Sequence, residues 1–206
     1  MISGKEALAR LRAGNERFVA HVRSLESQIS FLRRGELAAA QHPYAIVLGC
    51  SDSRVPAELV FDVGLGDLFV IRVAGNIVAP SQVGSVEFAA ERYGSRLVVV
   101  LGHSHCGAIM ATLEELQNPQ GDHSRNLRSI VDRVRPSVET LLELGVPGDE
   151  ERLVQECVRA NVRASANHLR NGSVVLERLI AEGGLLVVGA EYSLETGRVD
   201  FFDGVP

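Results

Sequence analysis

The sequence predicts an α/β fold with a mostly parallel β-sheet core flanked by helices. Short runs rich in branched apolar residues lack the alternation of half-exposed strands, which indicates strands covered on both faces. A helical pattern separates two of these runs, and strand, helix and strand within about 35 residues are typical of a right-handed βαβ unit. The 206 residues, 46% of them hydrophobic, are enough to bury one substantial core.

The order of the expected elements follows from these patterns and from the residues that interrupt them. Strands are expected at residues 44–49, 68–73, 97–102, 185–190 and 198–202, and helices at 5–22, 29–40, 83–93, 108–116, 127–144, 150–169 and 174–181. Ser3 is expected to cap the first helix and Gly94 to follow the end of the third. Pro136 should start or kink its helix. Residues 195–197 should form a hairpin-like turn.

No repeat, low-complexity segment or linker divides the chain, so we expect a single domain over residues 1–206. Within it, residues 1–40 form an N-terminal helical arm before the first strand, and residues 41–206 form the α/β core. The helices of the arm have narrow apolar stripes. Their pattern leaves open whether they pack on their own domain or dock on a neighbouring subunit.

The composition is typical of a soluble globular protein in a reducing compartment. The net charge of −5 argues against nucleic acid binding, because phosphates require a basic face. Three cysteines do not make a disulfide framework, and they favour metal or catalytic roles. We find no secretory signal, and no run reaches the roughly 18 apolar residues that a membrane span needs. We therefore expect a cytoplasmic protein.

Two short motifs follow the first and third expected strands. The first reads C-S-D-S-R at residues 50–54, and the second reads H-S-H-C at residues 103–106. In open α/β sheets functional groups gather beyond the carboxyl ends of the strands, so we expect Cys50, His103 and Cys106 to meet. Two sulfur ligands and one nitrogen ligand suit zinc and leave a fourth position open.

The fourth position of the expected zinc site has two candidates. Cys157 lies within a helical pattern and is expected in the core, and His105 is expected to point away from the site. The position is therefore filled by water, which makes the site catalytic, or by Asp52. Arg54 can pair with Asp52 and hold it as a hydrogen-bond acceptor for zinc-bound water. Ser104 is expected to cap the helix that follows the second motif.

The ligand set also predicts a pH dependence. Zinc lowers the pKa of bound water from about 15.7 toward roughly 7 in an all-histidine site. Two thiolates cancel the formal charge of the zinc here, so we expect the water to be less acidic. Activity should then rise with pH through a pKa above neutrality, and a flat rate between about pH 6.5 and 9 would contradict this expectation.

At these two motifs the sequence resembles the β-class carbonic anhydrases, and the resemblance covers nearly the whole chain. It implies zinc on Cys50, His103 and Cys106, with Asp52 and Arg54 as a catalytic pair. It implies reversible hydration of carbon dioxide to bicarbonate and a proton, through attack by zinc-bound hydroxide. It also implies N-terminal helices that reach a partner subunit, and hence a homodimer or homotetramer with the active cleft at the dimer interface.

Four further residues match the family in looser ways. Gln41 corresponds to a substrate-binding glutamine, and Phe88 falls where an aromatic residue lines the apolar pocket. Arg72 and Tyr192 match two of the three residues that bind regulatory bicarbonate in some members, where the aspartate replaces water on the zinc. The third residue is tryptophan in those members and Val47 here. A closed state with the aspartate on zinc is a hypothesis for low pH.

Two other functions share this pattern. Hydrolases of carbon disulfide or carbonyl sulfide use a similar zinc site, and the motifs do not separate them from carbonic anhydrases. A non-catalytic zinc or thiol redox sensor would use Cys50 and Cys106 as oxidisable thiols. Such a sensor has no need of a paired carboxylate beside the metal, which argues against it.

Overall fold

The computed structural model describes residues 2–25, 34–118, 124–145 and 150–206. The helix expected over residues 29–40 falls partly outside these ranges, and its described part is the short α3 (Arg34–Leu37). The other expected helices and strands form, with ends that differ by a few residues. Two short elements were not expected, α4 (Ala57–Val60) and the 3₁₀ turn η1 (Ala74–Asn76).

The described strands form one five-stranded sheet in the order β2-β1-β3-β4-β5. The first four strands in the chain run parallel, and the last is antiparallel to β4, which confirms the predicted mostly parallel sheet and the hairpin. All residues of β1 and β3 are buried, as continuous apolar runs require. The strands are β1 (Ala45–Gly49), β2 (Leu68–Arg72), β3 (Leu97–His103), β4 (Leu186–Tyr192) and β5 (Val199–Asp203).

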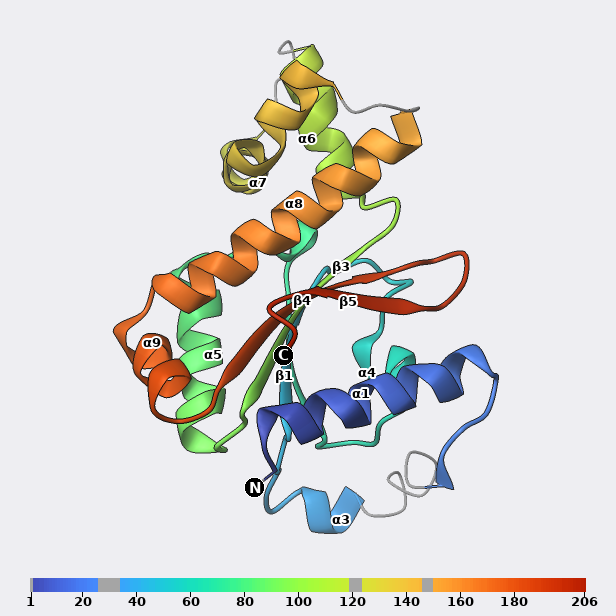
Figure 1. Ribbon diagram of the computed structural model, residues 1–206, viewed down its shortest axis with the longest axis vertical. Helices are drawn as coiled ribbons and strands as arrows, with labels where there is room; N and C mark the ends of the chain where they lie inside the picture. Colours follow the sequence, from blue (N-terminus) through green and yellow to red (C-terminus); the bar gives the residue numbers. More distant parts are fainter. Residues whose placement is uncertain (1, 26–33, 119–123, 146–149) are drawn as a thin grey trace.

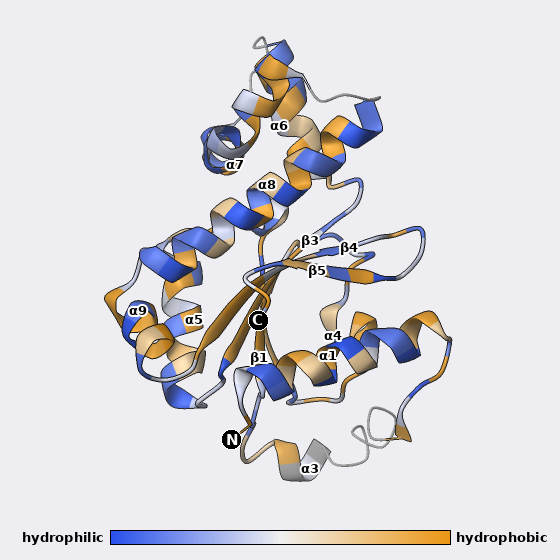
Figure 2. Ribbon diagram, in the orientation of Figure 1, coloured by the Kyte–Doolittle hydropathy of each residue, from blue (hydrophilic) through white to orange (hydrophobic). Residues whose placement is uncertain are grey.

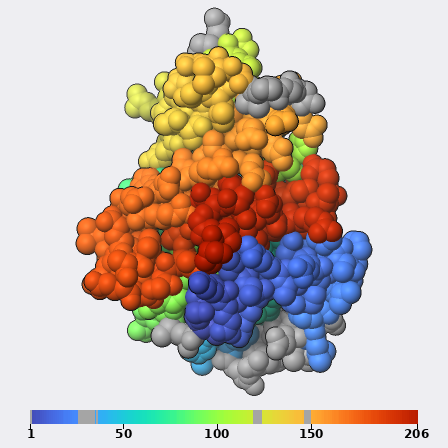
Figure 3. All heavy atoms as spheres, viewed as in Figure 1, coloured from blue at the N-terminus to red at the C-terminus, as the bar shows by residue number. Residues whose placement is uncertain are grey.

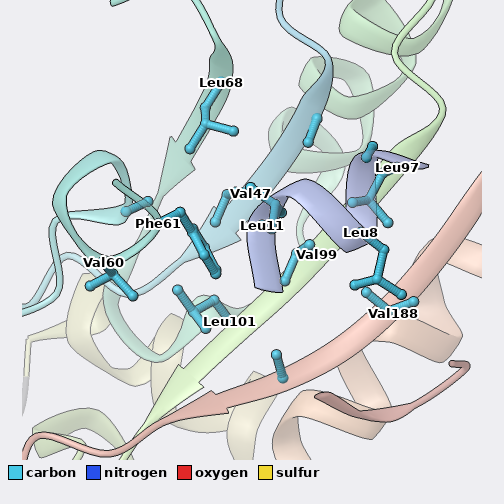
Figure 4. Packing of buried hydrophobic residues seen from close by; sticks show 14 of the residues in the cluster. Leu8, Leu11, Val47, Val60, Phe61, Leu68, Leu97, Val99, Leu101 and Val188 are labelled. Atoms are coloured by element: carbon cyan, nitrogen blue, oxygen red, sulfur yellow. The ribbon is translucent and has the colours of Figure 1, made fainter. Parts of the chain in front are cut away.

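Helices cover both faces of the sheet (Figure 1). One face carries α1 (Gly4–Val19), whose Leu8 and Leu11 pack among side chains of the central strands, such as Val99 (Figure 4). The other face carries three helices that bury the alternate strand residues, α5 (Pro80–Arg92), α8 (Glu150–Asn171) and α9 (Val174–Ala181). The strands are therefore hydrophobic along most of their length (Figure 2).

A third, smaller core lies beyond the carboxyl ends of the strands, at the top of Figure 1. It is enclosed by α6 (Gly107–Gln117), α7 (Arg125–Leu144) and the first half of α8. The three cysteines, Cys50, Cys106 and Cys157, all belong to this core. The position of Cys157 confirms the prediction that it is a core residue.

The ends of the helices follow local sequence signals. The Ser3 hydroxyl accepts the Glu6 N–H at 3.2 Å and caps α1, as predicted. Gly94 follows α5 with a φ of 68°, a backbone conformation that glycine adopts without strain. The helix around Pro136 does not start there: α7 begins at Arg125 and passes through the proline.

Helix α1 is attached to the β4–β5 hairpin of the same chain, and the two lie side by side in the space-filling view (Figure 3). The Asn15 amide donates to the carbonyl of Gly197 at 2.9 Å and accepts the Val199 N–H at 2.9 Å. The described part of the N-terminal arm thus packs on its own core. No helix in the described ranges has both the length and the hydrophobicity that a membrane crossing requires.

Candidate metal centre

The two motifs meet where the strand order changes direction. From β1 the chain first adds β2 on one side and then β3 on the other, and the carboxyl ends at such a switch point form the usual ligand crevice of α/β sheets. Cys50 follows β1, His103 ends β3, and Cys106 immediately precedes α6. One ligand atom from each of these residues lies within 4.8 Å of the other two. The predicted ligand set is therefore assembled in one chain.

His103 presents a free nitrogen to this cluster. Its Nδ1 lies 2.9 Å from the Ser104 carbonyl oxygen, and since a carbonyl can only accept, this assigns the proton to Nδ1. The Nε2 atom is buried and has no hydrogen-bond partner within the described residues. A buried polar atom without a partner is costly, so its lone pair is suited to a metal ion. The donor set of two sulfurs and one imidazole nitrogen fits zinc.

The thiols of Cys50 and Cys106 interact directly with each other. The pKa of Cys50 is lowered to about 4, chiefly by a hydrogen bond from Cys106 and in smaller part by the Gly75 N–H, against the opposing effect of burial. The same hydrogen bond with Cys50, together with burial, raises the pKa of Cys106. A thiolate in a buried cluster attracts a cation.

Asp52 stands beside the ligand cluster in an ion pair with Arg54. The Arg54 Nε donates to Oδ1 at 3.0 Å, and its Nη2 donates to Oδ2 at 2.8 Å. These side-chain hydrogen bonds hold the pKa of Asp52 well below its ordinary value. Oδ2 is 4.0 Å from the free Nε2 of His103, but the carboxylate is not among the mutually close ligand atoms. The structure thus has Asp52 paired with Arg54.

Arg72 holds the backbone of the first motif. Its Nε donates to the Cys50 carbonyl at 2.9 Å, and its Nη2 donates to the Asp52 carbonyl at 2.5 Å. Tyr192 is buried on the face of the sheet that α1 covers, where its ring packs at 6.4 Å from Phe18. Burial raises the pKa of Tyr192. Arg72 therefore contacts the candidate centre through backbone carbonyls, whereas Tyr192 lies in the core below it.

Gln41 and Phe88 lie at the amino end of the strands, opposite to the ligand cluster. Gln41 precedes β1 and donates to the hydroxyl of Tyr93 at 2.9 Å. Phe88 is 52% exposed on α5 and packs edge-on against the Tyr93 ring at 5.6 Å. The other ring beside it belongs to Phe69, near the start of β2. Within one chain, neither predicted substrate-binding residue reaches the ligand cluster.

The prediction that Ser104 caps α6 is wrong, because Cys106 occupies the cap position. The Ser104 hydroxyl instead donates to the Glu195 carboxylate at 3.0 Å and accepts the Leu194 N–H at 2.9 Å. His105 adopts a φ of 51°, which turns the chain between Ser104 and the helix. Its Nε2 pairs with Glu195 at 2.8 Å, and it is not part of the ligand cluster, as expected.

Two residues of the site were missed in the sequence. Glu195 joins the β4–β5 turn to the second motif, but an isolated surface acid gives no sequence signal. Gly75 donates its N–H to the Cys50 Sγ at 3.4 Å. A sequence signal did exist for Gly75, since a glycine close to the end of an expected strand can mark a close backbone approach.

Comparison with known proteins agrees with this geometry. A family model described as carbonic anhydrase matches residues 45–199, which include the whole ligand cluster. Carbonic anhydrase 2 of Mycobacterium tuberculosis is 41% identical over 201 residues, covering 95% of this chain and 91% of that protein. The carbonic anhydrase of Mycolicibacterium smegmatis is 40% identical over 190 residues, covering 92% and 89%. A crystal structure of tetrameric β-carbonic anhydrases from Sordaria macrospora matches with a TM-score of 0.76 at 25% identity, covering 96% and 97%.

Proposed function

This chain belongs to the β-carbonic anhydrase family and is a carbonate dehydratase, and we propose that it works with a zinc ion held by Cys50, His103 and Cys106. The enzyme catalyses the reversible hydration of carbon dioxide to bicarbonate and a proton. The observation that carries the choice of ligands is the buried Nε2 of His103, which has no hydrogen-bond partner among the described residues, beside two buried thiols. A bound zinc ion would supply the Lewis acidity that makes water a nucleophile near neutral pH.

The role of Asp52 in this proposal is to orient the attacking water. Arg54 keeps the carboxylate ionised and fixes both of its oxygens, so that Asp52 can only accept hydrogen bonds. An acceptor in a fixed position selects one orientation of the water, which lowers the entropic cost of reaching a reactive geometry. Asp52 as fourth ligand would require the two bonds to Arg54 to break. Arg54 therefore favours the open, catalytic arrangement over a closed one.

Gln41 and Phe88 are proposed to serve the site of a neighbouring subunit. In their own chain they lie at the opposite end of the sheet from the cluster. Phe88 with Phe69 and Tyr93 forms an aromatic group whose outer ring is half exposed, and such groups are common in interfaces. We accordingly propose a homodimer or homotetramer in the cytoplasm, in which the N-terminal arm also contacts the partner.

Regulation by bicarbonate through Arg72 and Tyr192 stays a prediction. It is supported by the contacts of Arg72 with the Cys50 and Asp52 carbonyls. An anion that draws the guanidinium away would release the segment that carries Asp52. Tyr192 has its ring in the core, and its part in such a response depends on the hydroxyl alone.

The test of the proposed function is a stopped-flow assay of carbon dioxide hydration between about pH 6.5 and 9, with zinc content measured on the same sample. We expect a rate that is proportional to bound zinc and that rises with pH. Cys106→Ser, which removes one ligand, should lose both zinc and activity. A zinc-loaded sample that does not hydrate carbon dioxide but releases sulfide from carbon disulfide would instead assign the hydrolase alternative.

A further inference from the structure

The 3₁₀ turn η1 closes over Cys50 from the end of β2. The Gly75 N–H in this turn donates to the Cys50 Sγ at 3.4 Å. Gly75 and Asn76 both have positive φ, 69° and 42°, and two left-handed residues in a row are an unfavourable backbone conformation for the asparagine. A side chain at Gly75 would come within 3.1 Å of the Ala108 Cβ. A larger residue at Gly75 would therefore be strained. The left-handed conformation of the turn also needs contacts from elsewhere in the protein to hold it.

Two side chains of α8 hold this turn in place. The Asn161 Nδ2 donates to the Gly75 carbonyl at 2.7 Å, and the Ser165 hydroxyl donates to the Asn76 carbonyl at 3.1 Å. Both side chains are buried, with residue exposures of 2% and 5%. They are four residues apart and so lie on the same face of the helix. The two bonds fix the peptide groups that follow Gly75 and Asn76, and so restrain the turn to which the Gly75 N–H belongs.

A hydrogen bond to a thiolate changes the electronic character of the sulfur. It stabilises the sulfur lone pairs, which makes the sulfur less basic and less electron-donating. The bond to Cys50 depends on the position of the Gly75 N–H. That position depends on the turn η1, which is anchored by side chains of α8.

We propose that Asn161, with Ser165, is a positioning residue of the metal centre, which holds the Gly75 N–H against the Cys50 sulfur. This inference rests on the proposed function, because it takes Cys50 to be a metal ligand. Asn161 touches neither the metal nor the substrate, and it acts through the backbone of Gly75. Its removal frees the turn to relax from its left-handed conformation and so moves the N–H away from the sulfur.

The test uses the full-length protein loaded with Co²⁺ in place of zinc, which makes the sulfur ligands visible by absorption. In Asn161→Ala, we expect the sulfur-to-cobalt charge-transfer band to move to lower energy, because the sulfur lone pairs are no longer stabilised. We also expect release of Co²⁺ to a chelator to become roughly 10-fold faster. This is the lower end of the loss in metal affinity that follows when a hydrogen-bond partner of a metal ligand is removed.

The matched control is Asn15→Ala. Asn15 is also buried, with 6% exposure, and its amide also donates to backbone carbonyls, those of Val60 at 3.1 Å and Gly197 at 2.9 Å. It has no bond to η1, so Asn15→Ala should lower stability and leave the band and the release rate unchanged. A merely structural role for Asn161 predicts that the two variants behave alike.

The proposal is overturned if Asn161→Ala binds Co²⁺ with the band and the release rate of the wild type. It is also overturned if Asn15→Ala shifts the band by the same amount. Should Asn161→Ala fail to fold, Ser165→Ala removes the second anchor and must shift the band in the same direction by less; an unshifted band there refutes the proposal. Failure of the wild-type protein to bind Co²⁺ or zinc would refute the proposed metal centre instead.

Discussion

The carboxyl and amino ends of the β-sheet hold functional candidates of opposite character. At the carboxyl end, the proposed ligands are buried, close together and complete within one chain. At the amino end, Gln41 and Phe88 are exposed. Gln41 donates a hydrogen bond to Tyr93, and Phe88 packs against the ring of the same residue. We therefore expect metal binding to be a property of the single subunit and full substrate binding to require a second one. Each prediction below changes one end and asks whether the other end responds.

The largest effect is expected at the carboxyl end, from His103→Ala. Loss of the imidazole leaves two thiols, which are too few to hold zinc in a catalytic site. We expect zinc content to fall to near zero and carbon dioxide hydration to fall by at least about 1000-fold. Metal analysis and a hydration assay on the same sample measure both. Retention of a full equivalent of zinc would show that the ligand set is wrong.

A smaller loss is expected from Asp52→Asn. The amide retains the size of the carboxylate, but it is uncharged and has only one oxygen. It therefore cannot accept both hydrogen bonds that Arg54 donates to Asp52. We expect zinc to be retained and kcat to fall by about 100-fold, the size of the loss that a poorly oriented reacting group can cause. A variant with wild-type kcat would remove Asp52 from the reaction and favour a non-catalytic role for the site.

The amino end is tested by mixing two variants. Gln41→Ala should lower kcat/KM about 10-fold, as expected for one lost hydrogen bond. When its subunits are exchanged with those of Cys106→Ser, each mixed dimer regains one intact site, made of the ligands of one chain and the Gln41 of the other. Random pairing in a two-fold dimer predicts about a quarter of the wild-type activity above the residual rates.

No recovery in this mixture, with subunit exchange verified by mass spectrometry, would show that Gln41 acts within its own chain or not at all. Val174→Ala is the control, because Val174 is exposed on α9 and has no proposed role. When Val174→Ala is added to either of the two variants, the activity of their mixture should stay the same.

The smallest effect is expected in the titration of Asp52. Because Arg54 lowers its pKa, the carboxyl contributes stability that is fully present above its ordinary pKa of 3.8 and is lost only as the pH falls through the lowered value. In Arg54→Gln the pKa should move back up, so that Asp52 takes up its proton at higher pH than in the wild type. A ¹³C NMR titration of the carboxyl measures this shift.

Arg17→Gln serves as its control, since Arg17 pairs with Asp62 at 2.6 Å on the side of the sheet that α1 covers. The titration of Asp52 should not change in that variant. An identical titration in the wild type and in Arg54→Gln would contradict the assigned cause of the lowered pKa.

The cluster of Cys50, His103 and Cys106 could be predicted because its residues lie at the ends of two strands that are adjacent in the sheet. Continuous apolar runs identified the strands, and parallel strands bring their carboxyl ends together, so Cys50 and His103 had to be neighbours. The same reasoning could not foresee the position of Ser104. Its hydroxyl bonds to Glu195, which is 91 residues away in the sequence. A local capping preference of about 1 kcal/mol gives way to such a tertiary contact.

The supports of the site were beyond prediction for the same reason. Asn161 looks like an ordinary polar residue of a long helix, and its bond to Gly75 spans 86 positions. Gln41 is a different case, because its proposed partner lies on another subunit. A single sequence shows the spacing of apolar residues, which predicts helices and strands, and the residues that favour local turns. The pairing of distant polar groups is decided by packing.

Arg72 is the last residue of β2, which is the edge strand of the described sheet. Its guanidinium ties this edge to the carbonyls of Cys50 and Asp52. A shift of this edge strand would therefore move the backbone of the first motif through one side chain. We expect any redesign of the edge to be felt at the candidate centre, so the edge and the centre have to be engineered together.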